Sequence, residues 1–257
     1  MAEATSIAPR KALLLMEGRA IPELFGFAAA LPTLSLLAPR GDGQPVLVLP
    51  GLTTNDTSTI AMRRFLKSKG YPTYGWKMGL NLGPRPGVER GLIDLVEGLH
   101  EEHGRKVSIV GWSLGGIYAR QLGKMMPDKI RQVISMGSPF GGSPRATNAW
   151  RVYEMASGQS SHDGERHMGG AISAPPPVPT TAIYSKTDGV CAWQNCIEAH
   201  SEIAENIEVK GSHCGLGHHP AAVYAVADRL AQPEGDWQHF DRSGFKSVLY
   251  PEPVYPH

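Results

Sequence analysis

The chain has 257 residues, of which 41% are hydrophobic and 19% are charged, and its formal net charge is +1. This length and composition fit one large α/β domain with a sizeable core. The nearly balanced charge gives no electrostatic reason to expect binding to nucleic acid or to an anionic membrane surface. The three cysteines, Cys191, Cys196 and Cys214, are too few for a disulfide scaffold. Reduced thiols are therefore expected, with a Cys196–Cys214 bridge as the open alternative.

Residues 1–42 are apolar and are expected to form a helical N-terminal extension. Glu17 and Arg19 interrupt the first apolar run, so no signal peptide is expected and a cytoplasmic location is favoured. The second run, Ile21 to Ala38, contains prolines and Glu23 and falls short of a clean membrane span. We expect this run to pack on the body of the protein or at a homodimer contact. The alternative is an apolar surface near a site entrance or a lipid interface.

From residue 43 onward, short apolar runs alternate with segments of helical apolar spacing. Continuous apolar runs are typical of strands that are buried on both faces. Asn55–Ser58 offers side chains that could cap the first of the helices. The expected strands are Val46–Leu49, Pro72–Trp76, Val107–Trp112, Ile130–Met136, Thr181–Ser185 and Asn206–Val209. The expected helices are 59–69, 88–103, 114–126 and 220–231. This alternation predicts an α/β fold with a mostly parallel central sheet and helices on both faces.

Residues 140–178 interrupt the alternation, because they contain no strand pattern and are rich in Gly, Ser and Pro. An insertion of this length in a compact domain is usually functional or disordered. A helix near Ala146–Ala156 would carry Trp150 and Tyr153 as apolar contacts. We interpret the segment as a helical lid or cap, with an inert surface loop as the alternative. The domain core is then 43–139 and 179–231, followed by an aromatic, proline-rich tail, 232–257, that is expected to pack on it.

The segment Lys106–Gly116 combines a β-branched strand, the pattern Gly-x-Ser-x-Gly and the start of a helical pattern. A serine hydroxyl is a poor nucleophile unless it is exposed and held beside a base. A sharp turn between strand and helix would expose Ser113, and glycines at 111 and 115 would let the strand and the helix approach each other. The motif is short enough to occur by chance, so its meaning depends on a base and an acid elsewhere in the chain.

Asp188 and His213 each follow a predicted strand later in the chain. In open parallel sheets, ligands bind at the carboxyl ends of the strands, so Ser113, Asp188 and His213 should meet there. They would serve as nucleophile, orienting acid and base. Two alternatives stay open, because Asp188 could belong to a simple turn and because Glu198 and Asp163 are rival acids. No metal is expected, since no Cys-x₂-Cys or His-Glu-x-x-His spacing is present.

Backbone N–H groups would have to stabilise the oxyanion that forms in such a reaction. Leu114 supplies the N–H directly after the proposed nucleophile. The second donor is expected after the first strand, where Leu52 follows Pro50-Gly51, with Thr53 as the alternative one residue further on. The expected substrate-pocket or lid residues are Thr53, Phe140, Trp150 and Tyr153.

The chain resembles the α/β-hydrolase superfamily, and within it the bacterial lipase- or esterase-like serine hydrolases, over about residues 46–231. The combination is far more specific than Gly-x-Ser-x-Gly alone. One departure is Pro50-Gly51, where many lipases carry His-Gly, and it leaves the second oxyanion donor open. The motifs that carry the resemblance are Leu49-Pro50-Gly51, Gly111-Trp112-Ser113-Leu114-Gly115-Gly116, Gly137-Ser138-Pro139-Phe140-Gly141-Gly142, Asp188-Gly189 and Gly211-Ser212-His213-Cys214-Gly215.

The resemblance implies hydrolysis of carboxylic esters through a Ser113–His213–Asp188 triad and an acyl-enzyme, with the amides of Leu52 and Leu114 as the oxyanion hole and with no cofactor. The apolar insertion and extension favour a small hydrophobic ester as substrate. An acyltransferase or a thioesterase would use the same triad. A non-catalytic protein of this fold that binds small molecules is a further alternative, because function depends on the site and not on the fold.

Overall fold

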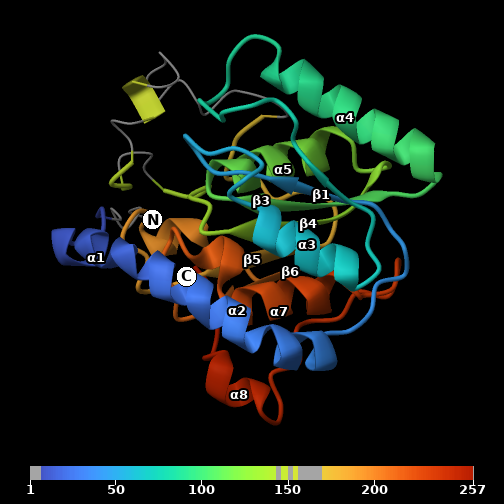
Figure 1. Cartoon of the computed structure of the whole chain (residues 1–257). Coiled ribbons are helices and arrows are strands. Elements are labelled where there is room, and N and C mark those ends of the chain that lie inside the picture. The colour runs from blue at the N-terminus through green and yellow to red at the C-terminus, as the bar shows by residue number, and fades with distance from the viewer. Residues whose placement is uncertain (1–6, 143–145, 150–152, 156–169, 257) are drawn as a thin grey trace.

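A computed structural model of the chain describes residues 7–142, 146–149, 153–155 and 170–256. Its centre is a six-stranded sheet in the order β2-β1-β3-β4-β5-β6, and every pair of neighbouring strands is parallel (Figure 1). The predicted parallel sheet is therefore confirmed. The strands are β1 (Val46–Leu49), β2 (Thr73–Gly75), β3 (Val107–Trp112), β4 (Ile130–Met136), β5 (Thr180–Tyr184) and β6 (Ala204–Glu208).

Helices cover both faces of the sheet, as the sequence predicts. Successive side chains of a strand point to opposite faces, so β1 contributes to two cores. Val46 and Val48 pack with α2 (Ala20–Leu37), α3 (Ile60–Ser68) and α7 (Pro220–Leu230). Leu47 and Leu49 pack with α4 (Val88–His103) and α5 (Leu114–Met125). Burial on both faces explains why the strands are continuous apolar runs without alternation.

The expected cap of α3 is wrong. Thr59 occupies the N-cap position, and no side chain there caps the helix. The Asp56 carboxylate instead accepts hydrogen bonds from the backbone N–H groups of Trp76 (2.9 Å) and Lys77 (3.0 Å). Asp56 therefore fixes the chain that follows β2, because those two amides lie beyond the last ladder bond and need an acceptor.

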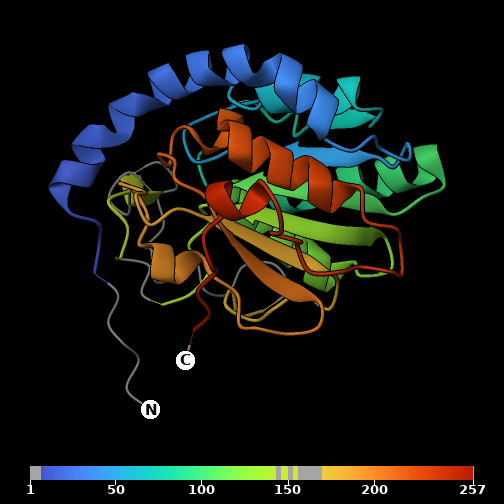
Figure 2. The ribbon, with the colours of Figure 1, turned by 90° about the horizontal axis from the view of Figure 1, so that it is seen from below.

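The N-terminal extension forms three consecutive helices, α1 (Lys11–Leu15), η1 (Met16–Arg19) and α2, which we call the N-terminal arm (residues 11–37). Figure 2 shows this blue arm curving over the orange helix α7. By length and composition alone the arm could cross a membrane. In the structure its inner face contacts the domain, with Phe27 and Leu34 buried in the core. Its outer face exposes large apolar side chains, among them Leu15, Ile21, Phe25 and Leu36.

The insertion 140–178 is described only in part. Residues 146–149 run beside the chain after β5, since Thr147 pairs with Cys191 in an antiparallel bridge and Ala192 N–H donates to Ala146 O. Residues 153–155 are helical. Trp150, Asp163 and most of the expected lid lie outside the described residues. The tail beyond residue 231 packs on α7, where the Tyr250 hydroxyl donates to Ala221 O at 2.8 Å.

Candidate active site

Ser113 lies at the sharp turn between β3 and α5. Its backbone has φ 53° and ψ −120°, which is a strained conformation for a residue with a side chain. The Ser113 N–H donates to Met136 O at 2.8 Å, and the Gly116 N–H donates to Ser113 O at 3.0 Å. Ser113 is half-buried. The sequence predicted this turn, and the turn holds the hydroxyl at the carboxyl edge of the sheet.

Glycines make the turn sterically feasible. A Cβ on Gly111 would lie 2.3 Å from Gly115 O, and a Cβ on Gly115 would lie 2.5 Å from Leu49 O. A Cβ on Gly116 would overlap the Ser138 hydroxyl. The backbones of β1, β3 and α5 therefore approach each other more closely than any side chain would permit. The predicted steric reason for Gly111 and Gly115 is confirmed, and Gly116 is a third glycine of the same kind.

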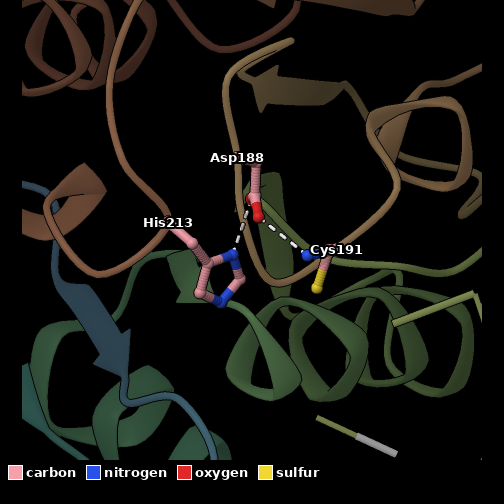
Figure 3. A group of neighbouring side chains, drawn as sticks. All are labelled: Asp188, Cys191 and His213. Carbon is pink, nitrogen blue, oxygen red and sulfur yellow. Dashed lines mark hydrogen bonds and ion pairs between the residues drawn. The ribbon is translucent and has the colours of Figure 1, made fainter. Parts of the chain in front are cut away.

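Asp188 and His213 form a buried hydrogen-bonded pair (Figure 3). The His213 Nδ1–H donates to Asp188 Oδ2 at 2.6 Å. The other carboxylate oxygen accepts the N–H groups of Val190 and Cys191, each at 2.7 Å. Asp188 follows β5 and His213 follows β6, so two residues distant in sequence meet at one sheet edge. Gly137, after β4, leaves them room, because a Cβ there would lie 3.1 Å from His213 Nδ1.

The environment of His213 makes it a stronger base. Burial disfavours the charged imidazolium, and burial alone would lower the pKa of His213. The Asp188 carboxylate and the adjacent Cys191 side chain together outweigh that effect, so the pKa of His213 lies well above its ordinary value of 6.5. In this pair His213 can therefore accept a proton, and the Asp188 carboxylate stabilises the imidazolium that results.

The structure brings the Ser113 turn and His213 into one region through Trp112. The Trp112 Nε1–H donates to His213 O at 3.0 Å, and the two rings lie 6.3 Å apart between centroids. In Figure 3 the imidazole nitrogen that does not bind Asp188 points away from the carboxylate. Within the described part of the chain, no hydrogen bond joins the Ser113 hydroxyl to His213.

The two expected oxyanion donors in the loop after β1 differ in their hydrogen bonding. The Thr53 N–H donates to Asn81 O at 2.7 Å, so it is already engaged. Thr53 also has φ 57°, a left-handed conformation that is uncommon for a residue with a β-branched side chain. Over the described ranges, the N–H groups of Leu52 and Leu114 make no hydrogen bond. In the described structure the Leu52 N–H is thus free where the Thr53 N–H is engaged, and the Leu114 N–H is free at the start of α5.

Two other expected pocket residues, Phe140 and Tyr153, lie within the described structure. Phe140 is buried, and its ring lies 3.6 Å from the Arg120 guanidinium carbon, so it packs inside the domain. Tyr153 is half-buried against the core on the α5 side of the sheet. The rival acid Glu198 forms a buried ion pair with Arg120, and it is Asp188 that bonds to His213.

All three cysteines are free, so the Cys196–Cys214 bridge is absent. Cys191, Asp188 and His213 offer donor atoms within 4.8 Å of one another, a spacing that a metal ion could use. A thiolate is the metal-binding form of cysteine, and a hydrogen bond with Cys196 together with burial raises the pKa of Cys191. Both carboxylate oxygens of Asp188 also already accept hydrogen bonds. The arrangement favours an acid–base pair over a metal centre.

Three charged residues of the N-terminal arm surround this pair. In the sequence, Glu17 and Arg19 only interrupt the first apolar run and Glu23 lies within the second, so the pattern assigns them no role at the site. In the structure all three point inward from the N-terminal arm and bond to the loops that carry Asp188 and His213. Their isolation within an apolar run was the available signal, because a charge there needs a partner.

No family model matches the chain. Among solved structures, the chain is similar to lipase B from Aspergillus fumigatus, with a TM-score of 0.61 and 17% identity over 83% of this chain and 58% of that lipase. The chain has the α/β-hydrolase fold. It is also similar to alpha/beta hydrolase domain-containing protein 10 from mouse, with a TM-score of 0.52 and 16% identity over 73% of this chain and 88% of that one.

A lipase from Bacillus licheniformis in its propeptide form gives a TM-score of 0.52 and 16% identity over 80% of this chain and 54% of the lipase. The α/β-hydrolase chain described here thus spans between half and two thirds of the length of either lipase. At such identities, likeness to these proteins establishes the fold.

Proposed function

We propose that the protein is a serine hydrolase that cleaves carboxylic esters. The observation that carries the proposal is the buried 2.6 Å hydrogen bond between Asp188 and His213, at the sheet edge where the strained turn exposes Ser113. A buried carboxylate that orients an imidazole, next to a serine on such a turn, is the arrangement that nucleophilic acyl transfer requires. The α/β-hydrolase fold and its lipase and esterase neighbours support the same reaction class.

The reaction proceeds in two halves. Ser113 Oγ attacks the ester carbonyl carbon while His213 takes the hydroxyl proton at Nε2, and the carbonyl electron pair moves onto the oxygen. When that oxyanion collapses, the bond to the alcohol oxygen breaks and His213 gives its proton to the leaving alcohol. Water then attacks the acyl-enzyme, His213 takes a proton from it, and Ser113 leaves with that proton.

The proposed oxyanion hole consists of the backbone N–H groups of Leu52 and Leu114. Neither N–H is engaged within the described ranges, and the Thr53 N–H is occupied by Asn81 O. Removal of one such donor typically lowers turnover by ~10²–10³. The Ser113–His213 hydrogen bond would form on substrate binding, since catalytic hydrogen bonds are often long or misaligned without substrate.

We propose a small hydrophobic ester as the substrate. Tyr153 and the apolar N-terminal arm both lie against the α/β-hydrolase core, and the outer face of the arm exposes Ile21 and Phe25. A transient contact of this face with a lipid interface is part of the proposal, with a homodimer contact as the alternative outcome. The cytoplasmic location stays a prediction.

Fluorophosphonate labelling read by intact mass tests the proposed function. We expect one adduct on Ser113 in the wild type and none in Ser113→Ala, with hydrolysis of p-nitrophenyl esters lost in the variant. A folded wild type that forms no adduct would sink the hydrolase proposal. A Ser113→Ala protein that kept full activity would sink the site assignment. Faster transfer to an added alcohol than to water would instead identify an acyltransferase.

A further inference from the structure

A carboxylate of the N-terminal arm lies between the two loops that carry the proposed acid and base. Glu17 Oε1 accepts the N–H of Gly189 at 2.7 Å and the N–H of His213 at 3.0 Å. Glu17 Oε2 accepts the N–H of Cys214 at 2.8 Å. One side chain therefore binds the residue after Asp188 and the backbone of His213 itself.

Two further charged residues of the arm bind the same loops on either side of Glu17. The Arg19 guanidinium donates to Thr187 O at 2.6 Å and to Gly211 O at 3.0 Å. The Glu23 carboxylate accepts the Ser212 N–H at 2.9 Å and the Ser212 hydroxyl at 2.5 Å. Arg19 and Glu23 also pair with each other at 3.4 Å. Arg19 thus also joins the two loops, because Thr187 lies in the loop that carries Asp188 and Gly211 lies in the loop that carries His213.

The two loops are shaped to receive the arm. A Cβ on Gly189 would lie 2.3 Å from Leu13 O, and a Cβ on Gly215 would overlap the Glu23 carboxylate. Neither glycine has a positive φ, so the need is space for the arm and not turn geometry. The alternative that Asp188-Gly189 is only a turn pair is therefore not needed to explain Gly189, because a side chain at this position would overlap the backbone of the arm.

Hydrogen bonds to a charged acceptor are short and strong, and these bonds are partly buried. The two loops leave different strands, β5 and β6, and their spacing at the site depends on what joins them beyond the sheet edge. Near the ends of the strands the two loops are joined directly, since the Ser185 and Thr187 hydroxyls donate to Gly211 O at 2.7 Å and 3.1 Å. At the Asp188–His213 pair itself, Glu17 of the arm joins the loops a second time. A misplacement of 1 Å at a reacting group can lower a rate by ~10².

We propose that Glu17 is a positioning residue for the acid–base pair, holding the Asp188 loop and the His213 loop at the separation that their hydrogen bond requires. This inference rests on the proposed function, because it assigns Glu17 a role in that reaction. The N-terminal arm is then a component of the site and not an appendage of the α/β-hydrolase core.

The test is Glu17→Gln. Glutamine has one acceptor oxygen and no charge. With that oxygen in the place of Oε1, its NH₂ group faces the Cys214 N–H, which loses its acceptor, and the bonds from Gly189 and His213 lose their charged acceptor and weaken. We expect kcat for a short p-nitrophenyl ester to fall by about 10- to 100-fold with KM unchanged. We also expect the downfield ¹H NMR signal of the His213 Nδ1 proton to broaden or vanish, because that proton becomes exposed to exchange.

Two matched controls separate this effect from general loss of charge or of arm packing. Glu101→Gln makes the same chemical change on the exposed surface of α4, and Met16→Gln changes an exposed side chain next to Glu17. Both are expected to leave kcat and the Nδ1 proton signal as in the wild type. Unchanged kcat and Nδ1 signal in a folded Glu17→Gln protein would overturn the proposal.

Glu17→Asp decides the question if Glu17→Gln does not fold. It retains the charge and both acceptor oxygens but is one methylene shorter, so positioning predicts a smaller kcat loss with a weakened Nδ1 signal. A purely structural role predicts a lower Tm with kcat unchanged well below that Tm, and this result would contradict the proposal. Failure of the proposed function is distinguishable, because wild-type protein would then form no fluorophosphonate adduct.

Discussion

The two halves of the candidate site are held in place by different means. The Ser113 turn is fixed by the backbones of β1, β3 and α5 packing against glycines, within one continuous segment and its neighbouring strand. The Asp188–His213 pair lies on two loops that are bound by side chains from residues 17, 19 and 23, far away in sequence. The comparison teaches that the proposed nucleophile is positioned locally and that the loops of the proposed acid–base pair are bound by a remote segment.

The largest expected effect comes from breaking the acid–base half. Asp188→Asn leaves the geometry nearly unchanged but favours the wrong imidazole tautomer, and in serine proteases the equivalent change lowers kcat by ~10⁴. We expect a loss of that order in ester hydrolysis. Asp94→Asn, an exposed acid on α4, is the control and should keep full activity. A folded Asp188→Asn protein with near-wild-type kcat would remove Asp188 from the mechanism.

The Ser113 half is tested by Gly115→Ala. The new Cβ would lie 2.5 Å from Leu49 O, a backbone atom that cannot move without displacing β1. We expect a loss of at least ~2 kcal/mol in the free energy of unfolding and at least ~10² in kcat. Gly98→Ala, in open space on α4, should be neutral or stabilising by up to ~1 kcal/mol. Urea unfolding and ester kinetics measure both. Equal behaviour of the two variants would contradict the steric account of the turn.

The pH dependence sharpens the comparison, because only the acid–base half titrates in the relevant range. His213 must be neutral to accept a proton. Burial lowers its pKa, but Asp188 and Cys191 together raise that pKa well above 6.5. We therefore expect kcat/KM to rise with pH through a pKa above 6.5, and the rise to move to lower pH in Asp188→Asn. Because the pKa of His213 is higher in the folded protein than in the unfolded chain, protonated His213 stabilises the fold. This contribution to the free energy of unfolding is complete below pH 6.5 and is lost as the pH rises through the folded-state pKa. If the rise of kcat/KM stays at the same pH in Asp188→Asn, the group that titrates there is not His213.

The smallest expected effect concerns Cys214, the residue after His213. Its side chain is exposed, but partial desolvation and the nearby Glu17 carboxylate raise the pKa of the thiol to about 12. We therefore expect Cys214 to react more slowly with iodoacetamide in the folded protein than in denaturant. Cys214→Ser should change the free energy of unfolding by less than ~0.5 kcal/mol. Thiol titration in denaturant without reductant should find three free thiols. A count of one would mean that a disulfide forms.

The regular elements were predictable because their signals are local. The β3 and β4 ranges were predicted to the residue, and those of β5 and β6 to within about two residues. Buried parallel strands are short continuous apolar runs, and helices carry a period that can be read from neighbouring residues. The predicted cap of α3 was wrong. The Asp56 carboxylate could accept N–H groups at the start of α3 or the N–H of Trp76, twenty residues later, and only the tertiary contact favours Trp76.

For the site, the sequence by itself determined the Ser113 turn and the positions of Asp188 and His213 after strands, since a parallel sheet brings the carboxyl ends of its strands to one edge. Tertiary structure alone decided that the Thr53 amide is engaged and the Leu52 amide is free, because the acceptor for Thr53 is Asn81, which lies 28 residues later in neither helix nor strand. It alone also revealed Glu17, Arg19 and Glu23 as partners of the acid and base loops. Contacts between segments nearly two hundred residues apart follow no periodicity, and they exist only once the arm has folded across the sheet edge.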